Sequence, residues 1–287
     1  MNNIKYFFQF FFIVLLFFIF KLIGYKFSII LSGKILNIIG PLFRSKNICL
    51  SNLSIAFPKM SNEDKENIIK KMWNNYGKVF AEYMFISNFR KKIRYSQNIL
   101  IENQDELNKI KISNQPVIFI SGHFNNFELM AMHIEKSGID LAAIYRPLNN
   151  KFLNPIMEKI RKKYICKNQI EKGISGTKKL LRYFKSGKSI ALMIDQRVSE
   201  GIRCNLFGQK ALTTTIPAQF VKKFNAKIIP IHIERIKFDK FKLKVFKPLV
   251  FKKEESIDTI TLELNKFLEK MICKNPEQWI WTHNRWK

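Results

Sequence analysis

The sequence predicts an α/β domain with a central, mostly parallel β-sheet that is flanked by helices. From about residue 115 onward, short apolar runs typical of buried strands alternate with segments of helical periodicity, which is the pattern of parallel-sheet folds. Polar side chains follow three of these runs, at the strand ends where such sheets usually carry their sites. The chain has 287 residues, of which 47% are hydrophobic, and this is enough for one large domain with appendages.

Periodicity places the expected elements along the chain. The predicted strands cover residues 117–121, 141–145, 189–194, 227–235 and 241–250. The predicted helices cover residues 127–137, 154–164, 176–185, 216–224 and 257–273. An antiparallel pair of strands is expected at the end of the sheet. Together these elements define a predicted α/β core over residues 116–287.

The chain begins with a strongly apolar segment. Residues 6–20 are apolar or aromatic apart from Gln9, and with the residues that follow they approach the roughly 20 needed to span a bilayer. A cleaved signal peptide is the alternative, but no pair of small residues marks a cleavage site after the segment. We therefore expect residues 1–25 to be a retained, single-pass transmembrane anchor. Basic residues are more numerous after the segment than before it, and the positive-inside rule then places the rest of the chain in the cytoplasm.

Residues 26–115 are predicted to form an interfacial and helical segment that packs on the core. Apolar residues recur at near-helical spacing over 27–43, which fits either a helix in the membrane interface or an ordinary core helix. Pro58 interrupts the chain, and Ser61 with Asp64 resembles a helix cap. A long helix is expected from residue 62 to about 87. Glu82 lies on or near its apolar face, where a glutamate is usually solvated or paired with a surface lysine.

The formal charge of +28 indicates the kind of partner that the protein attracts. A phospholipid surface, a phosphorylated lipid, an acidic carrier protein and a nucleic acid all carry the opposite charge. A coding bias toward Lys, Ile, Asn and Phe would also explain part of the lysine excess. The four cysteines are widely scattered, with neither metal-site spacing nor a disulfide framework, which favours a reducing compartment.

A candidate site lies where the first strand of the core ends, in the stretch Gly122-His123-Phe124-Asn125-Asn126-Phe127-Glu128. On one continuous helix, His123 and Glu128 would point about 140° apart. Across a turn between a strand and a helix, the two side chains can converge. A neutral imidazole can take a proton from an alcohol near pH 7, and a carboxylate on its other nitrogen would fix the tautomer. The stretch therefore predicts a base and an acid that act together.

Arg146 and Asp195 also directly follow predicted strands, so three polar groups are expected at the same edge of the sheet. No serine or cysteine nucleophile is needed if an alcohol attacks an activated acyl group, and the sequence has no Gly-x-Ser-x-Gly elbow. It also has neither a Walker loop nor a Gly-x-Gly-x-x-Gly stretch, and no cofactor is expected. His232 and Glu234 share one face of a predicted strand, but no third metal ligand is matched to them.

Four blocks of the sequence resemble one known family. The stretch 122–128 is similar to the Gly-His-x-x-Asn-Trp-Glu motif of the late lipid A acyltransferases, the lauroyl and myristoyl transferases of Gram-negative inner membranes. The second block comprises Tyr145-Arg146-Pro147, Asn154-Pro155 and Arg161. The third comprises Asp195-Gln196, Gly201, Phe207-Gly208, Ala211 and Thr213. The fourth comprises Trp279, Trp281, His283 and Arg285-Trp286-Lys287, and the blocks together cover nearly the whole chain.

The resemblance implies a fold like that of glycerol phosphate acyltransferases, tethered to the cytoplasmic face of the inner membrane. It implies transfer of a fatty acyl group from acyl carrier protein to a hydroxyl of a phosphorylated lipid A precursor. His123 and Glu128 match the family's catalytic dyad, in which His123 would deprotonate the acceptor hydroxyl and Glu128 would support the imidazolium. Arg161 matches an arginine that assists near the thioester oxygen.

The remaining predicted site residues would shape or charge-balance the substrate site, and they are Arg146, Asp195 and Asn126. Three positions depart from the family pattern: Asn125 stands for a frequent Gly, Phe127 for the usual Trp, and Ile216 for Gly. These departures are expected to preserve the reaction but to affect the choice of acceptor or acyl chain. The three tryptophans near the C-terminus, Trp279, Trp281 and Trp286, are expected to be core or interface anchors.

Two alternatives to this function are open from the sequence. The same chemistry could act on another acceptor, such as a glycerolipid, an amino-acid lipid or a glycosylated phosphoinositide. The charge alone would also fit a membrane-anchored binding protein for anionic lipid or nucleic acid. A nucleic-acid partner is not expected, because the sequence contains no recognised nucleic-acid-binding motif.

Overall fold

A computed structural model describes residues 2–91 and 98–287, and a seven-stranded sheet in the order β1-β9-β8-β2-β5-β3-β4 lies at its centre. The strands are β1 (Ile99–Glu102), β2 (Ile118–Ser121), β3 (Leu141–Tyr145), β4 (Asn168–Glu171), β5 (Ser189–Met193), β8 (Ile228–Lys237) and β9 (Lys240–Val245). Neighbouring strands are parallel except β8 and β9. A separate antiparallel hairpin is formed by β6 (Ile202–Leu206) and β7 (Gln209–Thr213).

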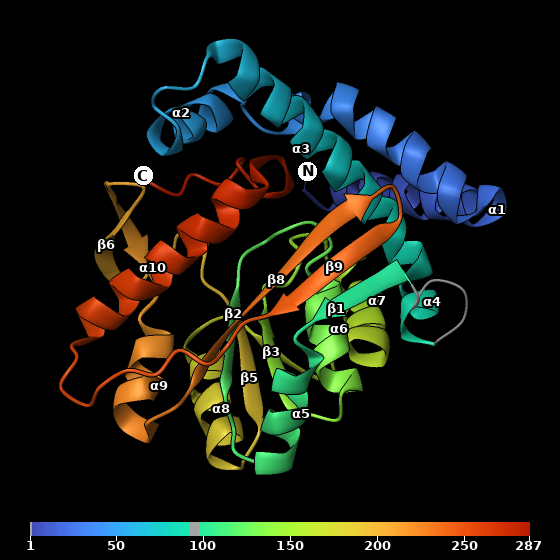
Figure 1. The fold of residues 1–287 in the computed structure, drawn as a ribbon. Coiled ribbons are helices and arrows are strands. Elements are labelled where there is room, and N and C mark those ends of the chain that lie inside the picture. Colours follow the sequence, from blue (N-terminus) through green and yellow to red (C-terminus); the bar gives the residue numbers. More distant parts are fainter. Residues whose placement is uncertain (1, 92–97) are drawn as a thin grey trace.

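Helices surround this sheet (Figure 1). They are α1 (Asn2–Phe43), α2 (Lys46–Ala56), α3 (Asn62–Glu82), α4 (Ile86–Arg90), α5 (Gln104–Ser113), α6 (Glu128–Lys136), α7 (Asn154–Ile160), α8 (Ile174–Lys185), α9 (Ile216–Phe224) and α10 (Ile257–Lys274). Three short turns extend them: η1 (Tyr83–Phe85), the π-helical η3 (Arg161–Ile165) and η4 (Pro276–Gln278). Figure 1 shows α1, α2 and α3 grouped across the end of the sheet toward which β8 points.

The predicted α/β class is confirmed, and its central strands follow from burial on both faces. All four residues of β2 are buried, as are the first seven of β8. A strand covered on both sides reads as an uninterrupted apolar run, which is why these strands are visible in the sequence. The predicted antiparallel pair is β8 with β9, but it lies one strand in from the edge, because β1 pairs in parallel with β9.

The segment before the core also contributes to the sheet, since β1 is its edge strand. The predicted cap of the long helix is confirmed: the Ser61 side chain accepts a hydrogen bond from Asp64 N at 3.0 Å. That helix, α3, ends at Glu82 rather than near residue 87, and the chain continues through η1 into α4. The division of the chain at residues 25 and 115 stays a prediction.

Helix α1 is bent at Gly24, which has a φ of 78° that favours glycine. Across the bend, the Ser28 hydroxyl donates a hydrogen bond to the Phe20 carbonyl at 2.7 Å. Beyond the bend, α1 packs closely on α3, where a Cβ at Gly77 would lie 2.1 Å from Ser32 O. Residues 27–43 are therefore a packed helix on one face, while apolar side chains such as Phe27 are exposed on the other.

Candidate active site

His123 lies just beyond the carboxyl end of β2, where the chain turns toward α6. Its backbone N–H donates to Asp195 Oδ2 at 2.8 Å, and its ring Nδ1 is 2.8 Å from Asp195 Oδ1. Asp195 follows β5, which pairs in parallel with β2, so the two strand ends lie side by side. Gly122 permits this approach, because a Cβ there would lie 3.2 Å from Asp195 Cβ and 2.8 Å from the Phe124 ring.

Asp195 is fully buried and receives three hydrogen bonds. The third comes from Trp279, whose indole Nε1 donates to Asp195 Oδ2 at 2.8 Å. Burial alone would raise the pKa of Asp195, but the adjacent His123 and these hydrogen bonds keep the pKa below its ordinary value. An ionised carboxylate is therefore fixed against Nδ1, and His123 carries its neutral-state proton on that nitrogen.

The same pair sets the protonation of His123. Burial would lower the pKa of the imidazole, but the charge of Asp195 and its hydrogen bond raise the pKa above the ordinary histidine value. The His123 side chain is 22% exposed, so a substrate can reach it. With Nδ1 bonded to Asp195, Nε2 is the nitrogen that can take a proton.

A second cluster lies beside the first, around Glu128 at the first residue of α6. Glu128 Oε1 accepts hydrogen bonds from the Tyr83 hydroxyl and from Arg161 Nε, the latter at 2.8 Å. Arg161 Nη2 is also 2.7 Å from the same oxygen and donates to the Tyr83 hydroxyl at 3.2 Å. Burial would lower the pKa of Arg161, but the charge of Glu128, the neighbouring Tyr83 and the hydrogen bonds to both together raise the pKa, so the guanidinium stays charged.

The partners of Glu128 differ from those that the sequence predicts. The carboxylate that bonds the His123 ring belongs to Asp195, whereas Glu128 bonds Arg161 and Tyr83. Glu128 still acts on His123 through space, because its charge contributes to the raised pKa of the imidazole. The roles of the two carboxylates in a reaction stay predictions.

The turn between His123 and Glu128 is fixed by buried amides. Asn125 has a left-handed φ of 44°, which asparagine tolerates better than most residues, and its Oδ1 accepts from Asn126 N at 2.8 Å. Its Nδ2 donates to Asn75 of α3 and to Gln278 of η4, each at 2.9 Å. Asn126 turns the other way, and its Nδ2 donates to Glu82 Oε2 at 2.9 Å. The predicted site residue Asn126 therefore stabilises the turn through its hydrogen bond to Glu82 of α3.

Glu82 is completely buried and forms an ion pair with Arg235 of β8, at 2.8 Å from Nη1 to Oε1. The expectation that Glu82 is solvated or paired with a surface lysine is wrong, because α3 crosses directly over the strand ends. Arg235 also donates to Asn125 Oδ1 at 3.1 Å. One buried ionic network thus joins α3, the turn after β2 and the end of β8.

Removing one partner of this pair should destabilise the whole site. We expect Glu82→Gln to lower the free energy of unfolding by about 3–5 kcal/mol, because it leaves the buried Arg235 charge uncompensated. The measurement is urea unfolding of the detergent-solubilised full chain, followed by tryptophan fluorescence. Glu66→Gln is the matched control, since Glu66 pairs with Lys46 at 2.6 Å on an exposed surface and should contribute less than about 1 kcal/mol. Equal losses in the two variants would contradict a structural role for Glu82.

Arg146 is not brought into either cluster. It follows β3, which is separated from β2 by β5, and its exposed guanidinium contacts Asn149 Oδ1 at 3.4 Å. Its charge lowers the pKa of Lys172, after the larger effect of burial, so the two cations lie near each other. The prediction that Arg146 contacts substrate is untested by this geometry.

Sequence reasoning missed two residues of the site, Tyr83 and Trp279. Tyr83 lies within the predicted long helix over residues 62–87 without a role in the site, and Trp279 is predicted only as a core or interface anchor. Trp279 is indeed buried, at 1% exposure, but it also bonds Asp195. Burial and the charge of Glu128 keep the pKa of Tyr83 well above its ordinary value, so the phenol is a neutral donor. Both residues lie far from their partners in sequence, and only the resemblance in the C-terminal block pointed to Trp279.

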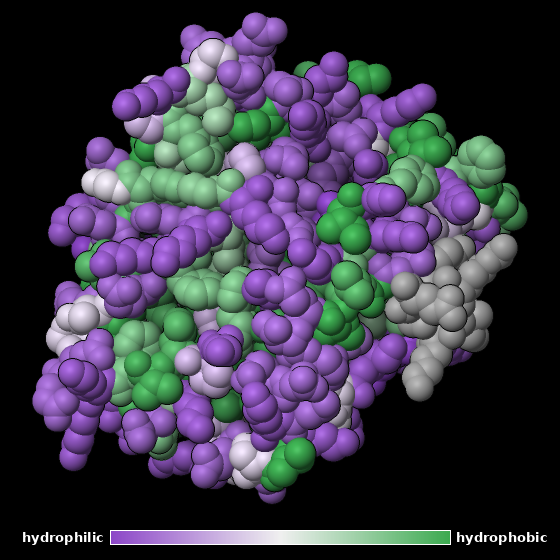
Figure 2. All heavy atoms as spheres, in the orientation of Figure 1, coloured by the Kyte–Doolittle hydropathy of each residue, from purple (hydrophilic) through white to green (hydrophobic). Residues whose placement is uncertain are grey.

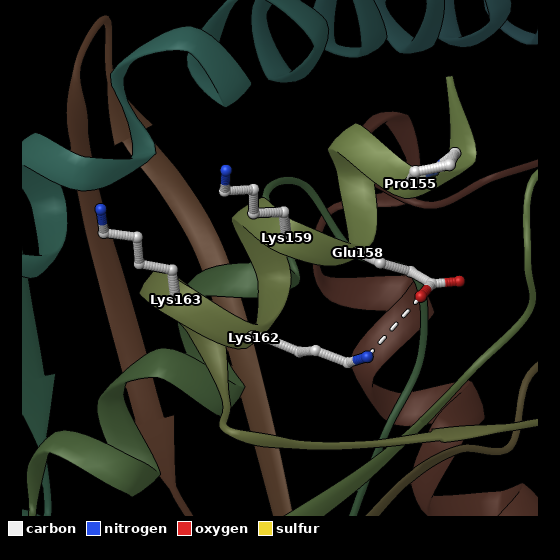
Figure 3. Close-up of a pocket in the computed structure, with 5 residues that line it drawn as sticks. All are labelled: Pro155, Glu158, Lys159, Lys162 and Lys163. Atoms are coloured by element: carbon white, nitrogen blue, oxygen red, sulfur yellow. Dashed lines mark ion pairs between the residues drawn. The ribbon is translucent and has the colours of Figure 1, made fainter. Parts of the chain in front are cut away.

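An open hollow of about 470 Å³ lies on the outer side of the segment that carries Arg161. Its lining residues are Pro155, Glu158, Lys159, Lys162 and Lys163, and they come from α7 and η3 (Figure 3). In Figure 3 the Lys162 side chain extends toward Glu158, at 3.7 Å, whereas Lys159 and Lys163 point away from it. We refer to this feature as the lysine hollow. The segments that line it, α7 and η3, also carry the site residue Arg161.

His232 and Glu234 both lie on β8 but have different neighbours. Across residues 2–91 and 98–287, no group of three His, Cys, Asp or Glu side chains could hold a metal ion. His232 packs its ring at 4.7 Å from the Phe124 ring, and Glu234 pairs with Lys274 at 2.8 Å. The pair that shares one strand face therefore has separate structural partners.

Comparison with known proteins places the chain among acyltransferases. The lipid A biosynthesis palmitoleoyltransferase of Escherichia coli (strain K12) is 22% identical over 248 residues, which cover 85% of this chain and 79% of the relative. The lauroyltransferase of the same strain is 23% identical over 254 residues, with the same coverage. The myristoyltransferase is 22% identical over 242 residues, which cover 83% of this chain and 73% of the relative.

The particular family follows from a match that extends over the whole chain. The family model for the bacterial lipid A biosynthesis acyltransferases matches residues 1–287, and the chain belongs to this family. The predicted resemblance is thereby confirmed. The three relatives are named for three different acyl groups, so membership in the family establishes acyl transfer in lipid A biosynthesis without fixing the chain that is transferred.

Proposed function

We propose that the protein transfers a fatty acyl chain from an acyl carrier protein thioester to a hydroxyl of a phosphorylated lipid A precursor. The acceptor in this proposal is the 3-hydroxyl of an acyl chain already attached to the sugar. The observation that carries it is the hydrogen bond of 2.8 Å between His123 Nδ1 and Asp195 Oδ1. It supports a general base at the strand end, because it leaves Nε2 of His123 free to accept the hydroxyl proton.

In the first step, Nε2 of His123 takes the hydroxyl proton while the oxygen attacks the thioester carbonyl carbon. The resulting imidazolium lies against the buried Asp195 carboxylate, which stabilises the positive charge. In the second step, the carbon–sulfur bond breaks, and the carrier thiolate takes the proton from the imidazolium. The products are an acyl ester on the lipid and a carrier protein with a free thiol, and His123 regains its starting state.

Arg161 is assigned to the negative charge that develops on the thioester oxygen between these steps. The Arg161 side chain is only 12% exposed, and Glu128 and Tyr83 fix the orientation of its guanidinium. A donor that is oriented before the reaction stabilises a developing oxyanion without having to reorganise. In this proposal Glu128 acts as a positioning residue for Arg161, and its charge also favours the protonated imidazole.

The donor and acceptor both suit the charge of the protein. An acidic carrier protein and a phosphorylated glycolipid are each attracted to a chain with a net charge of +28, and the lysine hollow carries part of that charge on the segments that include Arg161. One helix, spanning Asn3–Leu42, is long and apolar enough to cross a membrane. We infer that it holds the enzyme at the inner membrane, with the catalytic domain on the cytoplasmic face.

Purified full-length protein tests this function directly. It is incubated with a panel of acyl carrier protein thioesters and a phosphorylated tetra-acyl acceptor, and ester formation is followed by mass spectrometry. We expect thioester to be consumed and the acceptor to gain one acyl chain. Mass spectrometry of lipids from a deletion strain identifies the acceptor in the cell. Loss of a secondary chain from a glycerolipid or another lipid, with lipid A intact, would assign a different acceptor.

The oxyanion assignment predicts the effect of Arg161→Lys. Lysine keeps the charge but loses the planar fork that contacts Glu128 through two nitrogens, so we expect kcat to fall by about 10²–10³-fold. The control is Lys185→Ala, which removes a positive charge from the exposed end of α8 and should leave kcat nearly unchanged. If Arg161→Lys raised KM alone, the arginine would serve binding of the ground state rather than the transition state.

A further inference from the structure

The amino-terminal arm of α1, residues 2–23, lies along the catalytic domain and does not project from it (Figure 1). Near its start, the Tyr6 carbonyl accepts a hydrogen bond from Asn150 Nδ2 at 2.8 Å. The Phe7 and Phe10 rings pack on Phe152, at 5.9 Å and 6.1 Å between ring centroids. Residues 150–152 precede α7, which leads to the site arginine. The start of the arm is therefore seated on the loop before α7.

The other end of the arm is seated on α3. Phe17 packs on Phe80 at 5.0 Å between ring centroids, and Phe20, only 1% exposed, packs on the same ring at 6.3 Å. Just past the bend, Tyr25 is 3% exposed, and its hydroxyl donates to Glu82 Oε1 at 3.4 Å. The bend is thus buried in the same network that supports the active-site turn.

These two contact points determine how the arm can sit in a bilayer. Between Tyr6 and Phe20 a helix rises about 21 Å. In an arm that crossed the hydrocarbon core, about 30 Å thick, with Phe20 at the near face, Tyr6 would lie about 21 Å deep and away from an Asn150 that stays outside the membrane. Keeping that contact in a crossing arm would draw the exposed charges of Arg146 and Lys151 into hydrocarbon, where charged side chains are strongly disfavoured.

The outward face of the arm nevertheless needs an apolar environment. Six side chains on it are between 45% and 66% exposed: Ile4, Phe8, Phe11, Phe12, Leu15 and Phe18. The second arm of α1, which follows the bend at Gly24, adds the Phe27 and Ile38 side chains, which are 70% and 75% exposed. Apolar side chains are visible at the upper right in Figure 2, over α1, as they are at other places on this face. Exposed apolar area of this extent indicates an interaction surface.

We propose that α1 is a bent helix lying within the cytoplasmic leaflet of an anionic phospholipid bilayer, with both arms on the same side of the membrane. Charge complementarity favours this occupant over a protein partner, because Lys21, Lys26 and Lys34 are exposed along the same helix and suit anionic headgroups. The arm then rests beside the segments that carry Tyr83 and Arg161, so acceptor lipid reaches the site without leaving the leaflet. This arrangement replaces the single-pass anchor that the sequence predicts.

Site-specific labelling in membranes tests the topology independently of acyl transfer. Asn3→Cys in a Cys273→Ser background reports the start of the arm, and native Cys273, which is exposed, reports the catalytic domain. We expect a membrane-impermeant maleimide to label both positions in inside-out vesicles and neither in intact spheroplasts. Labelling of Asn3→Cys from the outside of spheroplasts would overturn the proposal in favour of a crossing helix.

Cross-linking tests the contact itself in native membranes. With Phe10→Cys and Phe152→Cys present together, we expect a short bismaleimide to join the two positions, with the linked peptides identified by mass spectrometry. Phe11→Cys with Phe152→Cys is the matched control, because Phe11 is 61% exposed on the outward face. At least several-fold more product is expected from the first pair. Equal yields from the two pairs would overturn the proposal even if all variants remained active.

Discussion

His123→Ala is expected to remove nearly all acyl transfer. A positioned general base contributes about 10²–10⁴-fold to a rate, and His123 is the base that the geometry places at the strand end. The measurement is kcat for the purified full chain with acyl carrier protein thioester and the phosphorylated tetra-acyl acceptor.

A second histidine separates this effect from a general loss of structure. His133 lies in the last turn of α6, outside both clusters, and burial lowers its pKa to about 4, so it is neutral near pH 7. We expect His133→Ala to retain most of the wild-type rate. Circular dichroism and thermal unfolding should show that both variants fold. Normal acyl transfer by His123→Ala would remove the histidine from the mechanism.

The strands that are buried on both faces of the sheet could be predicted from the sequence alone. Strands β2, β3, β5 and β8 are apolar runs because helices cover both sides of the sheet. Strands β1 and β4 were missed at the two edges of the sheet: β4 has only one apolar residue, Ile170, and β1 is a run of only three apolar residues, none of them fully buried. The β6–β7 hairpin was missed for a similar reason, since three of the first four residues of β6 are not buried.

The sequence predicted which residues form the site better than it predicted the hydrogen bonds between them. The motif spacing and the strand ends pointed to His123, Glu128 and Asp195, but the sequence paired the imidazole with Glu128 and gave Asp195 only a charge-balancing role. The register of the sheet determines which carboxylate bonds the imidazole. Strands β2 and β5 pair with Ser121 opposite Met193, and this places Asp195 at the His123 ring. Hydrogen bonds to Tyr83 and Trp279 span 45 and 84 residues of sequence, and no local pattern encodes such contacts.

Replacing Asp195 by Asn and Glu128 by Gln should distinguish the roles of these two carboxylates. In Asp195→Asn, the amide oxygen is expected at the Oδ2 position, because His123 N and Trp279 Nε1 both donate there. The amide NH₂ then faces His123 Nδ1 and forces the ring proton onto Nε2, which is the nitrogen that must be free. We therefore expect kcat to fall by about 10²–10⁴-fold, as for loss of the base itself.

The pH profile of kcat/KM provides a readout that misfolding would not imitate. The base works when neutral, so activity falls as the pH drops through the raised pKa of His123. Burial already lowers that pKa, and the Asp195 charge is the largest influence that raises it. In Asp195→Asn the pKa should therefore decrease, and the acid limb of the residual activity should move to lower pH. An unmoved acid limb would contradict an ionised Asp195 at the ring.

Glu128→Gln should behave differently, although it removes the same charge. The glutamine carbonyl can still accept from Tyr83 and Arg161, and the His123 tautomer is unaffected because Asp195 remains on Nδ1. We expect a smaller loss of kcat than in Asp195→Asn and a smaller shift of the acid limb, in the same direction, because Glu128 acts on His123 only through space. A larger loss and a larger shift in Glu128→Gln would restore Glu128 as the partner of the base, as the motif alone predicts.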